Sequence, residues 1–549
     1  MARVSLVGPE IEENLSLRYI ASSLAVAGHE SDIVPFNQPL DFNYAIERVL
    51  QYEPVVVGVS LAFQWRANDF LAFAVALREK GFKGHITMGG HFATFAAKDI
   101  MLDFPEISSI CRQEAEETMV ALTNAVVANG PLEGIPGLAL HGEDGDVIMT
   151  AHPALPDIHK LPRPDRRGVP AMCFGHGISP LVSSRGCYAN CSFCCIAAWH
   201  EQSLPGKRYR IREVEDVADE MVAMTKERNI DIFVFHDDNF FVPGHKRNFE
   251  RFSALADALE KRGIGRFATV VKARPTDVDP KVFDVLKNRL HCIRAYIGIE
   301  TDADAGLETL RRWSPAKQNK KSIDLVRKLD LYTCFNILLF DPDTTIEDIE
   351  TNIAFFRYAS EFPSNFGRVE LYAGTPLLHR MQQEGRTRGD YMQWDYDLSS
   401  PAMERVFSLT MDAFHERNFG NNALANRIMG TRFDVEVARH FHPEVTKPEW
   451  VEEGKRLSSI LSIDGADGLQ KIVDFVRRDA PRSEERDFVK EVAEGLRATE
   501  DSIRGRAKAL ARELRDAIGQ GEPLTEIGDV VATPLQQARQ VQFSAAATS

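Results

Sequence analysis

The sequence predicts an α/β protein with a helical C-terminal region, and three observations carry this prediction. Strand and helix patterns alternate over residues 1–150 and again over 181–385, which is typical of parallel sheets covered by helices. Beyond residue 390 the pattern is helical and charged. The chain has 549 residues, too many for one domain, and this length favours three domains.

The first region, residues 1–150, alternates short apolar runs with segments whose apolar residues recur at helical spacing. Its predicted elements are the strands Val4–Val7, Val55–Ser60 and Ile86–Gly90 and the helices Leu17–His29 and Phe70–Lys80. Gly28 is expected to close the first helix, because glycine adopts the left-handed conformation common at helix ends.

Six prolines fall between positions 153 and 180, so we expect residues 151–180 to form a linker. The second region, residues 181–385, contains six βα units. Its predicted strands are Leu181–Ser184, Ile232–His236, Ala268–Lys272, Ala295–Glu300, Cys334–Leu339 and Asn365–Leu371. Residues 386–532 are predicted to form a helical domain whose apolar stripes face a core, and residues 533–549 a disordered tail.

Composition excludes several functional classes. The net charge of −15 argues against a broad nucleic-acid interface. The sequence contains no long uninterrupted apolar stretch, so we expect no membrane span. The N-terminus also lacks the apolar core of a signal peptide. Half of the eight cysteines crowd one loop, which indicates metal binding in a reducing cytoplasm and argues against a disulfide framework.

That loop is the run Arg185-Gly-Cys-Tyr-Ala-Asn-Cys-Ser-Phe-Cys194. At this spacing the thiolates of Cys187, Cys191 and Cys194 can hold three irons of a 4Fe–4S cluster. A fourth cysteine at matching spacing is missing, so one iron stays open for a ligand from outside the protein. The alternatives are a zinc site, which favours paired C-x2-C units, and a ligand swap with the adjacent Cys195.

The loop resembles the radical S-adenosylmethionine (SAM) superfamily, in which an aromatic residue, here Phe193, precedes the third cysteine. The resemblance implies a partial (β/α)6 TIM-like barrel. It also implies that the open iron binds the amino and carboxylate groups of SAM, whose reductive cleavage releases a 5′-deoxyadenosyl radical.

Further barrel segments resemble the SAM site of this superfamily. Asp237-Asp-Asn-Phe follows a predicted strand and is similar to the motif that holds the SAM amino group, although an acidic turn that caps a helix is an alternative. Gly298-Ile-Glu300 is similar to a ribose-binding segment, and Tyr372-Ala-Gly-Thr-Pro376 to the run that closes the sixth strand. The fifth-strand turn, Phe340–Thr345, has lost both of the family's glycines. The implied SAM contacts are Phe193, Asp237, Asp238, Asn239, Glu300 and Gly374. Arg274, at the end of the third predicted strand, is a candidate for binding the methionyl carboxylate, and a surface arginine before Pro275 is the alternative.

Residues 1–125 resemble the Rossmann-like cobalamin-binding domain that precedes many radical SAM barrels. The resemblance rests on the helix Leu17–His29, on the strand Val55–Ser60 with its loop, and on Met88-Gly-Gly-His-Phe-Ala-Thr94. The implied cobalamin contacts are Ser60, Gln64, Trp65, Arg66, Gly89, Gly90, His91 and Glu114.

Two segments depart from the cobalamin-binding pattern. Gln113-Glu-Ala-Glu116 stands where the family has Gly-Glu-Gly-Glu, and the pocket is expected to persist only if φ stays negative at Gln113 and Ala115. The loop after the first strand, Gly8–Asn14, contains no histidine, so we expect no histidine ligand to cobalt. The loop with Gln64, Trp65 and Arg66 is the predicted lid beneath the ring. The alternative is a cobalamin-type domain that has lost its cofactor.

Together the resemblance implies a cobalamin-dependent radical SAM methyltransferase that acts on an unactivated carbon of a small molecule or natural product. Its cofactors are a 4Fe–4S cluster, SAM and cobalamin, and an external donor such as flavodoxin or ferredoxin supplies electrons. An oxidative cyclase or rearrangement enzyme with the same cofactors is the first alternative, and a non-catalytic cobalamin or redox sensor is the second. Trp394 and Tyr396 either shape the substrate pocket or anchor the C-terminal helices, and we favour the anchoring role.

Overall fold

The computed structural model describes residues 1–202, 208–420 and 423–519, which form two compact units. Unit 1 comprises Met1–Val169, Ser184–Glu213 and Leu371–Asp395. Unit 2 comprises Pro170–Ser183, Val214–Glu370 and the chain from Tyr396 onward. The cysteine loop therefore folds with the N-terminal region. None of the helices in the described ranges combines the length and apolar character that a membrane crossing requires.

Unit 1 is built on a seven-stranded sheet. Its first five strands pair in parallel, and the last two strands join through antiparallel pairings. In sheet order the strands are β2 (Glu30–Pro35), β1 (Arg3–Gly8), β3 (Val56–Ser60), β4 (His85–Gly89), β5 (Ser109–Cys111), β6 (Leu138–His141) and β7 (Val147–Met149). The strands predicted at Val4–Val7, Val55–Ser60 and Ile86–Gly90 correspond to β1, β3 and β4.

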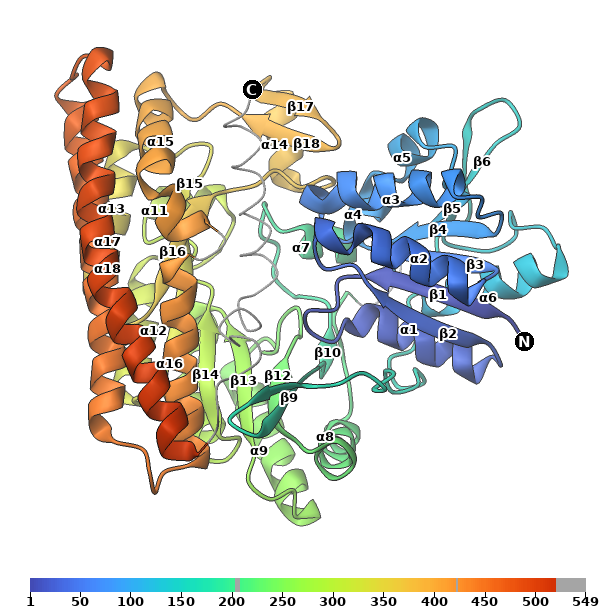
Figure 1. Ribbon diagram of the computed structural model, residues 1–549, viewed down its shortest axis with the longest axis horizontal. Coiled ribbons are helices and arrows are strands. Elements are labelled where there is room, and N and C mark those ends of the chain that lie inside the picture. The colour runs from blue at the N-terminus through green and yellow to red at the C-terminus, as the bar shows by residue number, and fades with distance from the viewer. Residues whose placement is uncertain (203–207, 421–422, 520–549) are drawn as a thin grey trace. The chain divides into compact units, whose positions relative to one another are not determined.

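Helices cover both faces of this sheet (Figure 1). One face carries α1 (Leu15–Val26) and α6 (Glu116–Ala128), and the other carries α2 (Phe42–Tyr52), α3 (Ala67–Glu79), α4 (His91–Phe95) and α5 (Ala97–Asp103). Asn14 caps α1 by accepting a hydrogen bond from the Leu17 N–H, and Gly28 follows its end with φ +83°. The predicted Rossmann-like arrangement is confirmed.

Two later stretches of chain complete unit 1. The first contributes the short ribbon β10 (Ser184–Arg185) and β11 (Arg210–Ile211) together with α7 (Cys195–Gln202). The second contributes α14 (Pro376–Gln383) and the hairpin of β17 (Thr387–Asp390) and β18 (Gln393–Tyr396). The predicted helical region thus begins with a hairpin, in which Gly389 has φ +80°.

Unit 2 is built on a second seven-stranded sheet. In sheet order its strands are β16 (Ser364–Arg368), β15 (Thr333–Phe340), β14 (Cys292–Ile297), β13 (Ala268–Ala273), β12 (Ile230–Phe235), β9 (His176–Leu181) and β8 (Ala171–Cys173). Six strands run parallel, as the six predicted βα units require, and β8 pairs antiparallel with β9. The predicted partial barrel is confirmed. The first barrel strand begins within the predicted linker 151–180, because β8 and β9 form a hairpin there.

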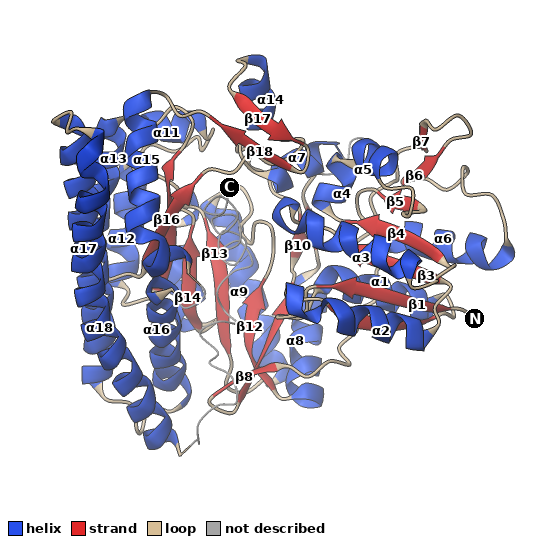
Figure 2. Cartoon of the chain, turned by 45° about the horizontal axis from the view of Figure 1, so that its top comes forward, coloured by secondary structure: helices blue, strands red, loops and turns tan. Residues whose placement is uncertain are grey.

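Helices follow the barrel strands in unit 2, namely α8 (Val214–Arg228), α9 (His245–Arg262), α10 (Pro280–Asn288), α11 (Asp304–Thr309), α12 (Lys317–Lys328) and α13 (Ile346–Tyr358). Four further helices complete the described part of the unit (Figure 2): α15 (Pro401–Phe414), α16 (Leu424–Phe441), α17 (Pro448–Arg477) and α18 (Glu485–Ile518).

The helix α16 ties the C-terminal helices to the barrel. Its Met429, Phe433 and Val437 share one apolar core with Ile232 and Val270 of the barrel strands. Its other side packs with α17 and α18 through a second core.

The predicted core-facing stripe of α18 is buried at Val492, Leu496, Ile503, Leu510 and Leu514. Tyr396 is 2% exposed, and its hydroxyl donates to the carbonyl oxygens of Phe340 and Val369 at the ends of barrel strands. It therefore packs on the barrel, and its predicted role as an anchor of the C-terminal helices stays a prediction. The tail predicted at 533–549 lies outside the described residues.

Candidate cofactor-binding sites

The cysteine loop lies between β10 and the first turn of α7. Cys191 and Cys194 close a turn in which the Cys194 N–H donates to the Cys191 carbonyl at 3.3 Å, and α7 begins at the next residue. All three cysteines are free of disulfides. Burial raises the pKa of the Cys194 thiol, as do the charges of Cys195, Cys191 and Cys187, while a hydrogen bond from the Ala197 N–H lowers it. The four thiols are therefore neighbours, and their burial and mutual charge keep the pKa of Cys194 above its usual range.

The cysteine loop can be compared with the needs of a 4Fe–4S cluster. In such a cluster each thiolate binds a different iron, so three thiolates on one loop can hold three irons. The donor set and the loop thus fit the cluster, with Cys187, Cys191 and Cys194 as the residues that would hold it. Cys195 stands close enough that a ligand swap stays open.

The acidic run after β12 divides into residues of different roles. Asp237 is 1% exposed, and its carboxylate accepts hydrogen bonds from the Ser183 N–H at 3.1 Å and the Ser183 hydroxyl at 2.7 Å. It fixes the end of β9. Asn239 is buried, and its Oδ1 accepts from the Phe241 N–H at 3.4 Å. Asp238 is exposed between them, which makes it the carboxylate of this run best placed for an external ammonium group.

The strand-end segment Gly298–Glu300 contains a strained residue. Glu300 has φ +65°, a conformation that costs a non-glycine residue about 1 to 3 kcal/mol and that gathers at functional sites. Arg312 donates to the Gly298 carbonyl at 2.5 Å and lies 4.0 Å from the Glu300 carboxylate. Arg274 in turn donates to the Arg312 carbonyl at 2.7 Å. The predicted Arg274 and Glu300 are therefore joined through Arg312, which the sequence motifs did not indicate.

Gly374 has a packing role inside unit 1. It has φ +76°, and a Cβ there would lie 2.1 Å from the ring of Phe95. The backbone N–H of the preceding Ala373 donates to the Gln64 side chain at 3.1 Å. One turn later, the Leu377 N–H donates to the Ser192 carbonyl at 2.9 Å, directly beside Phe193 in the cysteine loop. This segment thus touches both the cysteine loop and the loops after β3 and β4.

The predicted lid after Ser60 contains buried donors without hydrogen-bond partners in the described residues. Gln64 is 7% exposed and is engaged by Ala373. Arg66 is 4% exposed and donates to the Asp69 carboxylate at 2.6 Å and the Asn37 carbonyl at 2.8 Å. Trp65 has a buried indole N–H with no hydrogen-bond partner within the described ranges. One terminal nitrogen of Arg66 is likewise buried without a partner. A buried, unsatisfied donor is costly, so Trp65 and Arg66 both fit a bound group better than Gln64 does.

The glycine pair after β4 allows a close backbone approach. Gly90 has φ +109°, and a Cβ there would lie 2.9 Å from the backbone of Ala62 in the predicted lid. Gly89, in contrast, does not have a positive φ. His91 begins α4, and its ring meets the Trp199 ring of α7 edge-on at 3.8 Å. The predicted cobalamin loops therefore contact one another and, through His91, the helix that follows the cysteines.

In the altered Gln113–Glu116 loop, Gln113 has the positive φ that glycine favours. Ala115 has φ −107°, as expected, but Gln113 has φ +66°, whereas a negative φ was expected if the cobalamin pocket persists. The Gln113 N–H donates to the Thr94 hydroxyl at 3.0 Å. Burial alone would raise the pKa of Glu114, but the charges of Arg185 and Arg210 outweigh it and hold that pKa below its usual range.

The strain at Gln113 gives a stability prediction. Gln113→Gly should keep the unfolding free energy within about 1 kcal/mol, because relief of left-handed strain offsets the greater entropy of an unfolded glycine. Gln113→Val should lose about 2 kcal/mol, because a β-branched residue resists positive φ. Chemical denaturation of both variants measures this difference. Equal stability of the two would show that the loop relaxes to another conformation.

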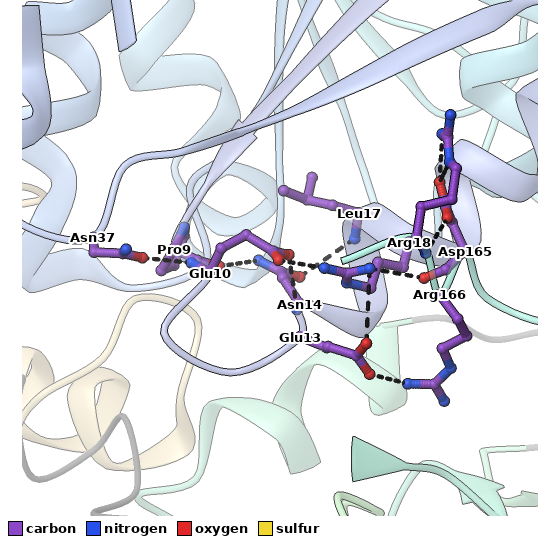
Figure 3. Close-up of polar contacts among 10 residues, drawn as sticks. Pro9, Glu10, Glu13, Asn14, Leu17, Arg18, Asn37, Asp165 and Arg166 are labelled. Carbon is purple, nitrogen blue, oxygen red and sulfur yellow. Dashed lines mark hydrogen bonds and ion pairs between the residues drawn. The ribbon is translucent and has the colours of Figure 1, made fainter. Parts of the chain in front are cut away.

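The loop after β1 is held by acidic residues (Figure 3). Glu10 accepts hydrogen bonds from the Arg18 guanidinium at 2.6 Å and the Asn14 N–H at 2.9 Å, and Glu13 pairs with Arg166 of the following proline-rich segment. Burial raises the pKa of Glu10, against the lowering effect of Arg18. Ion pairs thus fix the loop Gly8–Asn14, which contains no histidine.

Comparisons with known proteins agree with this geometry. Residues 6–123 match the B12 binding domain family, and residues 181–356 match the radical SAM superfamily. An uncharacterised methyltransferase of Pyrococcus horikoshii is 25% identical, over 66% of this chain and 77% of its own length. The anaerobic magnesium-protoporphyrin IX monomethyl ester cyclase of Rubrivivax gelatinosus is 22% identical (70% and 69%). The hopanoid C-3 methylase of Methylococcus capsulatus is 25% identical (70% and 71%).

Among solved structures, the cobalamin-dependent SAM radical enzyme OxsB has a TM-score of 0.65 and 16% identity, and the match covers 94% of this chain and 84% of OxsB. This likeness confirms the fold. The two family matches confirm the predicted domain types, and with them the predicted enzyme class and cofactor classes. Residues 6–123 of this chain therefore form a B12-binding domain, and residues 181–356 form a domain of the radical SAM superfamily.

Proposed function

We propose that this protein is a cobalamin-dependent methyltransferase that methylates an unactivated carbon of a small molecule. One observation carries the proposal furthest: the cysteine loop folds in the same compact unit as the B12-binding domain. His91 meets Trp199, Ala373 binds Gln64, and Leu377 binds Ser192. This joint packing supports an enzyme that uses both cofactors in one reaction. A sensor with a vestigial cluster has no need of it.

Different side chains would bind different groups of the cofactors. Cys187, Cys191 and Cys194 would hold the cluster, Asp238 would attract the SAM ammonium group, and Glu300 would accept hydrogen bonds from the ribose hydroxyls. When bound, the cluster and SAM supply a 5′-deoxyadenosyl radical and cobalamin supplies the methyl group. The protein contributes placement and exclusion of water.

The relatives support two reaction types. The hopanoid C-3 methylase and the Pyrococcus methyltransferase favour methyl transfer, and for this reason we place it first. The Rubrivivax relative is named a cyclase, which keeps oxidative ring formation as the second candidate. The electron donor, the cytoplasmic location and the substrate stay predictions.

The two candidates differ before any substrate is known. Reconstituted anaerobic protein with reduced cobalamin and SAM should form about one equivalent of S-adenosylhomocysteine per bound cobalamin, because a methyltransferase loads its methyl group from SAM. A cyclase should form 5′-deoxyadenosine without S-adenosylhomocysteine, and a sensor should form neither. Absence of S-adenosylhomocysteine from protein that holds cobalamin would contradict the proposal.

The axial environment of cobalt gives a separate prediction. His85 lies at the amino end of β4, opposite the cobalamin loops, and its ring bonds to Ser109 at 2.8 Å. Burial, with a smaller effect of Arg78, lowers the pKa of His85 to about 4. His91 packs on Trp199. We therefore expect the electron paramagnetic resonance spectrum of bound cob(II)alamin to lack nitrogen superhyperfine splitting from an axial base. A splitting that disappears in His85→Ala or His91→Ala would refute this expectation.

A further inference from the structure

Two arginines stand at the stem of the cysteine loop. Arg185 and Arg210 are direct partners across the β10–β11 ribbon, and Cys187 is the second residue after Arg185. Between them, Gly186 has φ +92°, and a Cβ there would lie 1.9 Å from the Arg208 carbonyl. The chain is therefore tightly closed where it enters the cysteine loop, so a displacement of the ribbon displaces Cys187 with it.

Both arginines bind the loop after β5. Arg185 reaches Glu114 at 2.7 Å with one terminal nitrogen and Glu116 at 2.7 Å with the other. Arg210 pairs with the second carboxylate oxygen of Glu114 and also donates to the Pro156 carbonyl at 2.9 Å. Glu114 thus joins two arginines, and Arg185 joins two glutamates.

The cluster of charges is buried and balanced. The exposed fractions of the side chains are 15% for Arg185, 10% for Arg210, 8% for Glu114 and 6% for Glu116. The Arg185 guanidinium also lies 4.7 Å from the centre of the Tyr19 ring. Two cations face two anions, so removal of one carboxylate leaves a buried positive charge uncompensated. Paired guanidinium and carboxylate forks also fix orientation, which a single point charge does not.

We propose that Arg185, Arg210, Glu114 and Glu116 form a strut that sets the position of the cluster relative to the cobalamin-binding loops. The four are positioning residues: they act on the cofactors through Cys187 and through the Gln113–Glu116 loop. The inference rests on the proposed function only in requiring that both cofactors bind. It assigns Glu114, predicted as a cobalamin contact, to the stem of the cysteine loop.

The distance between the two cofactors tests the strut directly. Reconstituted holoprotein with a reduced cluster and cob(II)alamin contains two unpaired spins, whose dipolar coupling falls with the cube of their separation. Glu114→Gln keeps the side-chain shape but removes the charge. We expect it to broaden or shift the dipolar splitting and to speed hydrogen exchange in residues 184–196, with iron and cobalamin contents near normal. Glu117→Gln, one helical residue beyond Glu116 and exposed, should change neither measurement.

Each outcome decides whether Glu114 positions the cysteine loop or contacts cobalamin directly. Unchanged coupling and exchange in folded Glu114→Gln would overturn the proposal. Weaker cobalamin binding with unchanged exchange would also overturn it and return Glu114 to a cobalamin contact. If Glu114→Gln does not fold, Arg210→Lys serves instead, because it keeps the charge and the Arg185 pairs but loses the fork, and the same two shifts are expected. Wild-type protein that binds no cobalamin would refute the proposed function, and exchange at 184–196 would still decide the strut.

Discussion

Alanine at Cys187, Cys191 or Cys194 is expected to abolish formation of 5′-deoxyadenosine from SAM. Each thiolate would hold one iron, and a cluster left with two protein ligands is not retained in a form that presents its open iron to SAM. The three cysteines lie on the loop that precedes α7, and the charges of the neighbouring thiols raise the pKa of Cys194. Anaerobic reconstitution, iron and sulfide analysis and product chromatography measure the loss.

Cys195→Ala is the matched control for these variants. Cys195 is the first residue of α7 and lies close to Cys194, yet it stands outside the C-x3-C-x2-C spacing. We expect it to keep most of the iron and most of the 5′-deoxyadenosine. Loss equal to that of the three other variants would make Cys195 a ligand and overturn the assignment.

Removal of the strand-end carboxylates should weaken SAM binding by roughly tenfold to one-hundredfold, which is the worth of one hydrogen bond to a charged group. Asp238→Ala removes the exposed acid after β12, and Glu300→Ala removes the strained acid after β14. Iron content should stay near normal, because neither residue belongs to the cysteine loop. Equilibrium binding of SAM to reconstituted protein measures the effect.

Two further variants sharpen this test. Glu308→Ala removes an exposed acid from α11, shortly after the same strand, and should leave SAM affinity unchanged. Asp237→Asn should instead lower stability, because Asp237 holds Ser183. Unchanged SAM affinity in both Asp238→Ala and Glu300→Ala would show that the strand ends do not bind SAM.

Local patterns predicted the fold. Apolar periodicity located most of the strands and helices, because this signal lies within short windows of sequence. The three-cysteine spacing indicated the cluster loop from an equally short window, and that assignment stays a prediction. The β8–β9 hairpin was missed for a physical reason. Its two-residue turn is Phe174-Gly175, with φ +48° and +85°, and phenylalanine stands where asparagine or aspartate usually marks such a turn.

The rest depends on residues far apart in the chain. Glu114 meets Arg185 and Arg210, 71 and 96 residues away, and no local pattern indicates such pairs. The positive φ of Gln113 is likewise imposed by its surroundings, since glutamine carries no preference for it. Arg312 was overlooked because it follows α11 and not a strand end.

Because unit 1 consists of three separate stretches of chain, it cannot fold completely until late in translation. Its first stretch ends at Val169 and its last begins at Leu371, so about 200 residues, or roughly 10 to 40 seconds of translation, separate them. During this interval Gln64 lacks Ala373 and Phe95 lacks Gly374. The nascent N-terminal domain therefore lacks these contacts until the barrel strands have been synthesised. Expression of residues 1–169 alone would yield a Rossmann-like sheet without the segments that complete it.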